Sequence, residues 1–198
     1  MIRIYHVPGT RSVRPIWLCH ELGLTIEVTP IDFGAAFRNS AEWRAISPAG
    51  KVPALSDGEL TMFESGAMLE YLLDRYGEGR LRPAPARRRA PCTSSGAGSP
   101  RRPSRVRWAW SASCARRPEE LPAAAAENAR NCLAAVDAAL AGRAFLMGGD
   151  FTAADVMMGY SLTLLERAQL LDTDQHPHAA AYFGRLQARA AYKRAASA

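Results

Sequence analysis

The stretch Ser47-Pro48-Ala49-Gly50-Lys51-Val52-Pro53-Ala54-Leu55 decides the fold of this chain. It combines two prolines, a glycine and a lysine, and it ends in an apolar run that we interpret as the start of a strand. A proline at Pro53 cannot donate to a sheet ladder, so it belongs at the entrance of a strand or in a tight turn. A cis bond there would leave the backbone groups of Val52 free to pair with an extended ligand.

The residues around this stretch predict a small α/β unit. Residues 1–7 alternate and are rich in β-forming residues, which indicates a strand. Gly23 is a suitable residue to end the helix that follows. A strand, a helix and a second strand in this order require a parallel pair joined by a right-handed crossover. We predict strands at 1–7, 26–32, 52–56 and 60–63, helices at 12–22, 37–46 and 64–76, and a hairpin turn at Asp57-Gly58.

The second half of the chain has a helical pattern. Residues 121–140 are rich in alanine and carry apolar residues at helical spacing. Phe151-Thr152-Ala153-Ala154-Asp155 has the form of a capping box, with Thr152 as the cap and Asp155 three residues later. We therefore predict a buried helix from Thr152 to about residue 171, with Asp155 in a structural role. A last helix is predicted from Pro177 to about residue 190.

Three motifs of this chain resemble those of the glutathione transferase superfamily, in particular its serine-type bacterial members. The first two lie at the family's spacing, and the resemblance covers residues 1–82 and 119–194. It implies an α/β plus all-α fold, with a thioredoxin-like domain at 1–76, a linker at 77–85 and a helical domain at 86–198. The motifs are Ser47-Pro48-Ala49-Gly50-Lys51-Val52-Pro53-Ala54-Leu55, Glu64-Ser65-Gly66-Ala67-Met68-Leu69-Glu70-Tyr71-Leu72 and Phe151-Thr152-Ala153-Ala154-Asp155.

The resemblance also implies a function. It predicts a cytoplasmic homodimeric enzyme of detoxification that joins the thiolate of glutathione, its co-substrate, to a small hydrophobic electrophile. The superfamily includes isomerases and dehalogenases as well, so a glutathione-dependent isomerase or dehalogenase is an alternative. A noncatalytic binding or scaffold protein of the same fold is the alternative from another class.

By this resemblance five residues bind glutathione. Val52 pairs its backbone N–H and C=O with the cysteinyl part, and a cis Val52–Pro53 bond is predicted because the turn must expose that backbone. Lys51 pairs with the glycyl carboxylate, although a solvated loop lysine is an equal interpretation. Ser65 binds the γ-glutamyl carboxylate at a helix N-terminus, and Glu64 accepts from the ammonium. The structural alternative for the last two is a simple helix start.

The catalytic residue implied by the resemblance is Ser12. Glutathione carries the reactive thiol itself, so the protein needs only to favour the thiolate, and a hydroxyl that donates to the sulfur does this. The structural alternative for Ser12 is a plain N-cap. Thr10 and Tyr5 are further hydroxyls nearby. Arg14 adds positive potential in one interpretation and is a surface charge in the other.

Residues 86–115 show no helical period, although the resemblance places a helix there that lines the second substrate site and forms much of a dimer interface. Three interpretations stay open: a disordered insert rich in arginine, proline and serine, a shifted reading frame in GC-rich DNA, and a functional basic arm. The composition supplies no apolar stripe, so we expect a weakened dimer and an incomplete second substrate site.

Composition indicates which kinds of partner and binding site this chain is not expected to have. The net charge is +6, but the segment 83–118 holds nine arginines and no acid, so the rest of the chain carries −3 and a nucleic-acid partner is not expected. The four histidines and four cysteines show no metal-ligand spacing, and no metal site is predicted. No leader pattern and no apolar run of membrane-spanning length is visible, which indicates a soluble cytoplasmic protein without a membrane partner.

Overall fold

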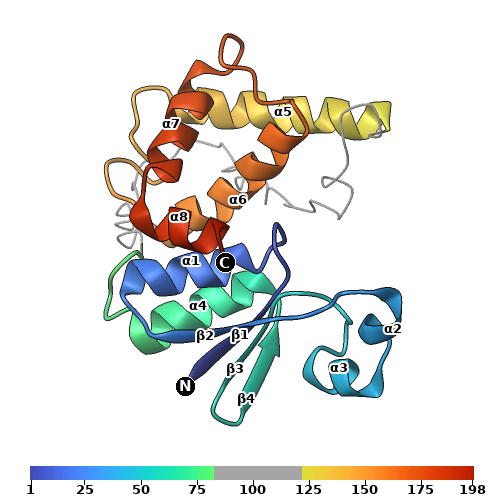
Figure 1. Ribbon diagram of the computed structural model, residues 1–198. Helices are drawn as coiled ribbons and strands as arrows, with labels where there is room; N and C mark the ends of the chain where they lie inside the picture. The colour runs from blue at the N-terminus through green and yellow to red at the C-terminus, as the bar shows by residue number, and fades with distance from the viewer. Residues whose placement is uncertain (83–121) are drawn as a thin grey trace, which may run out of the picture.

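The computed structural model of the protein describes residues 1–82 and 122–198. The predictions made for 86–115, and the end of the predicted linker at 83–85, lie outside these residues. The described chain forms an α/β unit and a helical unit stacked on each other (Figure 1). This is the predicted fold class.

The α/β unit is built on a mixed sheet with strand order β2-β1-β3-β4. The first strand runs parallel to the second, as the predicted crossover requires, and antiparallel to the third. Two helices lie between the sheet and the helical unit, and two short ones lie beside the sheet (Figure 1). The strands are β1 (Ile2–His6), β2 (Ile26–Pro30), β3 (Ala54–Asp57) and β4 (Leu60–Phe63), the inner helices α1 (Val13–Leu22) and α4 (Ser65–Tyr76), and the short ones α2 (Ala35–Arg38) and α3 (Ala41–Ile46).

Two local predictions in this unit were wrong. The helix predicted at 37–46 is two helices, because Ser40 accepts a hydrogen bond from the amide of Trp43 and begins a new helix there. The hairpin loop is Gly58-Glu59, one residue later than predicted, since Asp57 still pairs with Leu60. The first error adds a helix and the second shifts a turn by one residue, and neither changes the order of the strands.

The helical unit contains four described helices. The capping box is confirmed, with Thr152 as the cap and Asp155 reaching back to the backbone of Thr152. The helix that it starts ends at Arg167 rather than near residue 171, because Gln169 turns out of the helix with φ of 52°. The last predicted helix ends at Gln187 rather than near residue 190, and a further helix that was not predicted follows it. The elements are α5 (Ala123–Leu140), α6 (Ala153–Arg167), α7 (Pro177–Gln187) and α8 (Ala190–Ala196).

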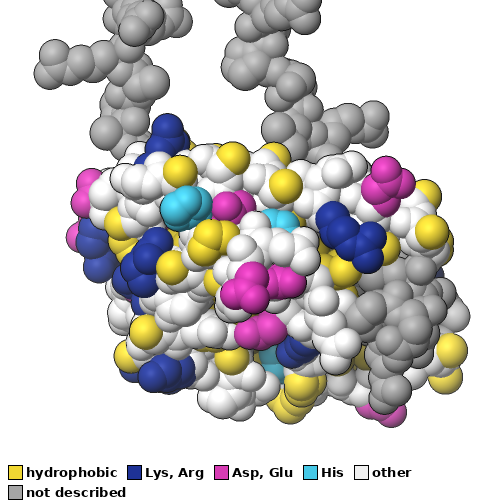
Figure 2. Space-filling view, turned by 90° about the horizontal axis from the view of Figure 1, so that it is seen from above, with side chains coloured by type: hydrophobic (Ala, Val, Ile, Leu, Met, Phe, Trp, Pro, Cys, Tyr) yellow, Lys and Arg dark blue, Asp and Glu magenta, His cyan; other side chains and the backbone are white. Residues whose placement is uncertain are grey.

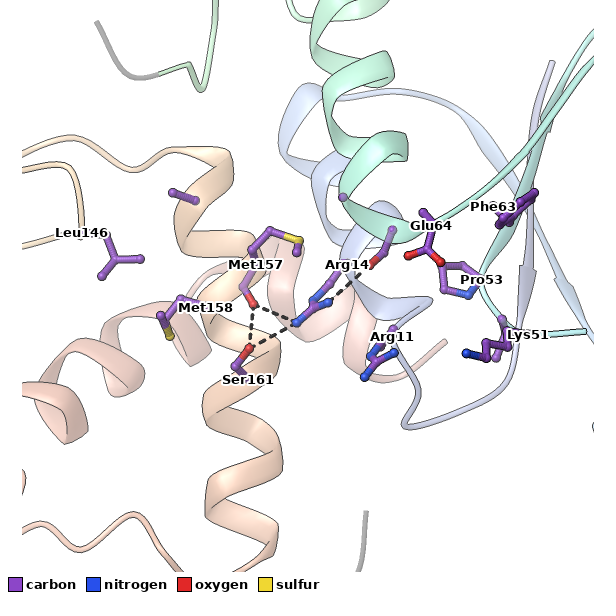
Figure 3. A pocket seen from close by; sticks show the side chains of 14 residues that line it. Arg11, Arg14, Lys51, Pro53, Phe63, Glu64, Leu146, Met157, Met158 and Ser161 are labelled. Carbon is purple, nitrogen blue, oxygen red and sulfur yellow. Dashed lines mark hydrogen bonds between the residues drawn. The ribbon is translucent and has the colours of Figure 1, made fainter. Parts of the chain in front are cut away.

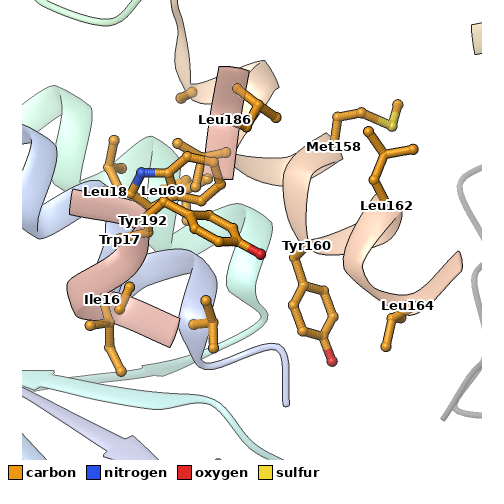
Figure 4. Close-up of a cluster of buried hydrophobic side chains, with 14 of the residues drawn as sticks. Ile16, Trp17, Leu18, Leu69, Met158, Tyr160, Leu162, Leu164, Leu186 and Tyr192 are labelled. Carbon is orange, nitrogen blue, oxygen red and sulfur yellow. The ribbon is translucent and has the colours of Figure 1, made fainter. Parts of the chain in front are cut away.

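The core crosses the boundary between the two units. Trp17 of α1 is fully buried, and its ring meets Tyr192 of α8 edge-on with centroids 4.9 Å apart (Figure 4). Gly159 of α6 lies against the same indole ring. Arg189 pairs with Glu21, also across the boundary, at 2.6 Å. The units therefore share one hydrophobic core, and a pocket at their boundary has fixed walls.

This close contact predicts opposite effects for two helical glycines. A Cβ at Gly159 would lie 2.6 Å from the buried ring of Trp17, so Gly159→Ala is expected to lower the free energy of unfolding by about 1–3 kcal/mol. Gly184 of α7 has open space around it, so Gly184→Ala is expected to raise that free energy by about 0.5–1 kcal/mol. Urea denaturation of both variants measures the difference. Equal effects would show that α1 and α6 do not pack as described.

Charge is mixed on the face that carries the helical unit. Lys and Arg side chains and Asp and Glu side chains are both present there (Figure 2). Within the described ranges, no helix has the length and hydropathy that a membrane span requires.

Candidate functional site

A cavity of about 500 Å³ opens between the two units. Its walls come from the loop before α1, the turn before β3, the start of α4 and one face of α6 (Figure 3). It is lined by Arg11, Arg14, Lys51, Val52, Pro53, Phe63, Glu64, Ser65, Gly66, Leu146, Ala154, Met157, Met158 and Ser161.

Five of the six predicted site residues meet in this cavity: Lys51, Val52, Pro53, Glu64 and Ser65. The Val52–Pro53 bond is cis, as predicted. Within the described chain, the backbone N–H and C=O of Val52 have no hydrogen-bond partner. An unpaired peptide group at the entrance of a strand can accept an extended ligand as an additional strand.

The turn that presents this backbone is held from behind by Ser47. The buried hydroxyl of Ser47 donates to the carbonyl of Lys51 at 2.8 Å and accepts from its amide at 3.2 Å. Gly50 takes a positive φ of 61°, which a residue with a side chain rarely adopts. These contacts fix the path of the chain immediately before Val52.

The start of α4 forms the second polar wall. Glu64 holds a φ of 77°, an unfavourable backbone for a residue with a side chain, and it lies in the cavity. The next residue, Ser65, begins α4 and is 7% exposed. Free amide groups and the helix dipole favour an anion at this end of a helix. The interpretation of these two residues as a plain helix start does not account for the backbone strain at Glu64.

Ser12 is the predicted site residue that does not line the cavity. Its side chain is fully buried, and its Oγ lies 2.8 Å from Nδ1 of His6 and 2.8 Å from Oγ1 of Thr10. Ser12 occupies the N-cap position of α1, but its side chain makes no capping hydrogen bond to the helix. Its hydroxyl instead ties the loop before α1 to strand β1.

Arg14 lies at the boundary of the two units, and its interpretation as a surface charge is wrong. It is 9% exposed, and its guanidinium donates to the hydroxyl of Ser65, the carbonyl of Met157 and the hydroxyl of Ser161 at 3.2–3.3 Å (Figure 3). Its Nε has no partner within the described chain, nor does any described carboxylate form an ion pair with it. A buried cation without an anion is costly, so a ligand that supplies one is favoured here.

The cavity is positively charged as a whole. Among its described lining residues, Arg11, Arg14 and Lys51 face a single acid, Glu64. Burial lowers the pKa of Arg14 to about 10, and repulsion from Arg11 adds to this, so the guanidinium of Arg14 is still charged at neutral pH. An anionic ligand would relieve that repulsion.

Most of the cavity-lining residues on α6 were not predicted. Ala154, Met157, Met158 and Ser161 follow the capping box at intervals of three and four residues and so share one helical face, a signal that was present in the sequence. Arg11 also lines the cavity and was not predicted, since no local pattern distinguishes it from a surface arginine. As for metals, the described residues contain no group of three or more His, Cys, Asp or Glu that could hold an ion.

The network around Ser12 predicts a dependence of stability on pH. His6 is buried between Ser12 and the backbone oxygen of Ala198, which lies 2.9 Å from Nε2. Burial lowers the pKa of His6 below its ordinary value of 6.5, only partly offset by the bond to Ala198. The unfolded chain therefore takes up this proton first. Stability is complete above pH 6.5 and falls as the pH drops below that value.

Replacing His6 by glutamine should remove part of this loss. The free energy of unfolding of the His6→Gln variant is expected to fall less between pH 7 and pH 5 than that of the wild type, since glutamine does not titrate. His20, whose pKa is also lowered by burial, is present in both proteins and leaves a remaining slope. Urea denaturation across this range measures both slopes. Identical slopes would contradict the assignment to His6.

Two family models match this chain, and both describe domains of one protein family. The model of the glutathione S-transferase N-terminal domain matches residues 1–74, and the model of the C-terminal domain matches residues 108–185. The second match begins inside 86–115, so the resemblance extends further back than the motifs indicated.

Similar curated proteins match the N-terminal part. A glutathione S-transferase of Silene vulgaris is 38% identical over 82 residues, which are 39% of this chain and 38% of that protein. Glutathione S-transferase 3 of Zea mays is 32% identical over 76 residues, which are 38% of this chain and 34% of that protein. The matched part thus spans just over a third of these relatives.

Similar solved structures cover the whole chain. The theta class glutathione S-transferase from Xanthomonas axonopodis pv. citri, with glutathione bound, has a TM-score of 0.72 and 28% identity, covering 100% of this chain and 97% of that one. A sphingomonad glutathione S-transferase complexed with glutathione has a TM-score of 0.72 and 26% identity, with 98% and 97% covered.

Proposed function

Because this chain belongs to the glutathione S-transferase family, we propose that its cavity binds glutathione and presents the thiolate to a small hydrophobic electrophile. The relatives with bound glutathione support the co-substrate, and the cavity supports it independently.

The single observation that carries the proposal is the unpaired backbone of Val52 between two polar walls. Glutathione is an extended peptide with a carboxylate at each end and an ammonium beside one of them. Lys51 lies at one side of Val52, where it suits the glycyl carboxylate. Ser65 and Glu64 lie at the start of α4, where they suit the γ-glutamyl carboxylate and ammonium. An unrelated anionic ligand would need neither the peptide edge nor the acid.

The opposite wall suits an apolar second substrate. Leu146, Met157 and Met158 face the cavity from the helical unit, and Phe63 faces it from β4 (Figure 3). Methionine side chains are flexible and polarisable, so they adapt to ligands of different shape. We therefore assign this wall to a hydrophobic electrophile rather than to a charged one.

Thiol conjugation tests the proposal. The full chain is mixed with glutathione and 1-chloro-2,4-dinitrobenzene, and formation of the thioether is followed by its absorbance against a reaction without protein. Saturable acceleration in both substrates is expected, with chloride released for each thioether formed. Retention on immobilised glutathione without acceleration towards any electrophile would favour the alternative of a noncatalytic binding protein. Failure to bind glutathione would contradict the proposal.

The proposal extends to assembly and location. We propose a homodimer, which light scattering would detect; Leu60 of β4 is a large apolar side chain that is 40% exposed. A reducing, cytoplasmic compartment suits glutathione chemistry, and the cysteines of the described chain, Cys19 and Cys132, are free thiols.

A further inference from the structure

We propose that Arg44 of α3 is a positioning residue for glutathione, because it holds the turn that presents the backbone of Val52. Arg44 lies outside the cavity: within the described chain, no residue of α3 is among the lining residues. The inference rests on the proposed function, since the turn has a peptide to receive only if the cavity binds glutathione. It adds which residue outside the cavity sets the affinity for that peptide.

The guanidinium of Arg44 joins the turn to the end of α2. Its Nη1 donates to the carbonyl of Pro48 at 2.8 Å, and its Nη2 donates to Oδ1 of Asn39 at 3.1 Å. The side-chain amide of Asn39 donates to the carbonyl of Ala35 at 3.0 Å, so Asn39 is held as well. A guanidinium presents its donors in one rigid plane. The two bonds therefore fix where Pro48 lies relative to α2.

The turn approaches this guanidinium closely at Gly50. A Cβ at Gly50 would lie 2.8 Å from Cζ of Arg44 and 3.0 Å from its Nη2. The amide of Gly50 donates to the carbonyl of Ser47 at 2.7 Å, which closes the turn. The hydroxyl of Ser47 holds the backbone of Lys51, so Arg44 and Ser47 hold the turn at two different places.

The helix that carries Arg44 is fixed to the sheet by the preceding residue. Trp43 is fully buried, and its ring meets that of Tyr5 of β1 edge-on, with centroids 5.7 Å apart. The centroid of the Phe37 ring, from α2, lies 5.5 Å from that of Trp43. Both short helices lie beside the sheet, apart from the helical unit (Figure 1). Arg44 thus connects the turn to a support that is itself packed on the sheet.

This support is expected to act on the affinity for glutathione and on little else. A peptide that pairs with Val52 as an additional strand needs the turn in one conformation, and a turn that is held beforehand loses less conformational entropy when the peptide binds. Arg44 and Pro48 are both exposed, so water can satisfy the carbonyl of Pro48 when the guanidinium is removed. The fold is therefore expected to tolerate the loss of Arg44, while the turn becomes more variable.

The test is the dissociation constant of glutathione for Arg44→Met, measured by calorimetric titration. This change removes the donors and keeps an unbranched side chain, and the dissociation constant is expected to rise about fivefold, the effect of losing one or two hydrogen bonds. Arg38→Met is the matched control, because Arg38 is also an exposed arginine of this segment, but its guanidinium lies over the ring of Phe33, 5.3 Å from the centroid. The dissociation constant of the control is expected to stay within about twofold of the wild type.

Kinetics with 1-chloro-2,4-dinitrobenzene distinguish a positioning role from a structural one. In Arg44→Met the KM for glutathione is expected to rise with the dissociation constant, while kcat at saturating glutathione stays within about twofold of the wild type. A structural role would instead lower the free energy of unfolding in urea and reduce kcat through loss of folded enzyme.

The inference is overturned by an unchanged dissociation constant in Arg44→Met, by an equal rise in Arg38→Met, or by a fall in kcat and stability with the dissociation constant unchanged. In each of these outcomes the wild type still binds glutathione, so the proposed function stands. If the wild type itself does not bind glutathione, the proposed function fails and this inference fails with it.

Discussion

Replacing Asp155 with alanine is expected to lower the free energy of unfolding by about 3–5 kcal/mol, because several buried donors lose their acceptor at once. Asp155 is fully buried, and its carboxylate accepts from the amide and hydroxyl of Thr152, the amide of Leu146 and the hydroxyl of Tyr182 at 2.8–3.0 Å. The carboxylate thus joins the start of α6, the loop before it and α7. Each donor left without a partner costs about 1–3 kcal/mol.

A second variant distinguishes the loss of the whole hydrogen-bond network of Asp155 from the loss of one hydrogen bond. Tyr182→Phe removes one donor together with its bond and is expected to cost only about 0.5–1.5 kcal/mol. Burial and the nearby carboxylate both raise the pKa of Tyr182, which is the direction expected for a phenol that stays protonated and donates. Urea denaturation of both variants gives the comparison. A loss below 1 kcal/mol in Asp155→Ala would show that the network does not hold the helical unit together.

Replacing Arg14 with methionine is expected to weaken glutathione binding tenfold or more without destabilising the fold. A hydrogen bond to a charged group contributes about 1.5–3 kcal/mol, which corresponds to roughly tenfold or more in the dissociation constant. Arg14 has no described carboxylate to balance its charge in the free protein, so its removal leaves no buried anion behind. Methionine fills similar space, and exchanging a buried charge for an apolar side chain is often neutral or stabilising.

Calorimetric titration with glutathione and urea denaturation of the same variant test this pair of expectations. Ser161→Ala is the control, since it removes one partner of Arg14 from the α6 side and leaves the cation in place. Binding by Ser161→Ala is expected to stay within about threefold of the wild type. A large loss of stability in Arg14→Met with unchanged binding would mean that Arg14 holds the two units together rather than the ligand.

The features that were predictable from the sequence are local ones. The cis bond before Pro53 and the capping box of Thr152 and Asp155 depend on a few consecutive residues, and both are confirmed. The order of strands and helices follows from short patterns in the same way. The break at Ser40 was missed because a single cap divided one apolar run into two helices.

The positions of side chains at the boundary could not be predicted in this way. Arg14 and Met157 are more than 140 residues apart in sequence and meet only because α1 packs on α6. Ser12 was predicted as the catalytic hydroxyl, but its orientation is set by His6 on the neighbouring strand, which no local pattern reports. The sequence thus located one polar wall of the cavity, and packing determined which charged groups reach it.

A crystal structure of this protein with glutathione tests the central claim most directly, namely that the cavity between the two units is a glutathione site. The peptide is expected to pair with the backbone of Val52, with its glycyl end at Lys51 and its γ-glutamyl end at Ser65. Glutathione bound away from this cavity, or bound in it without pairing with the backbone of Val52, would contradict the account.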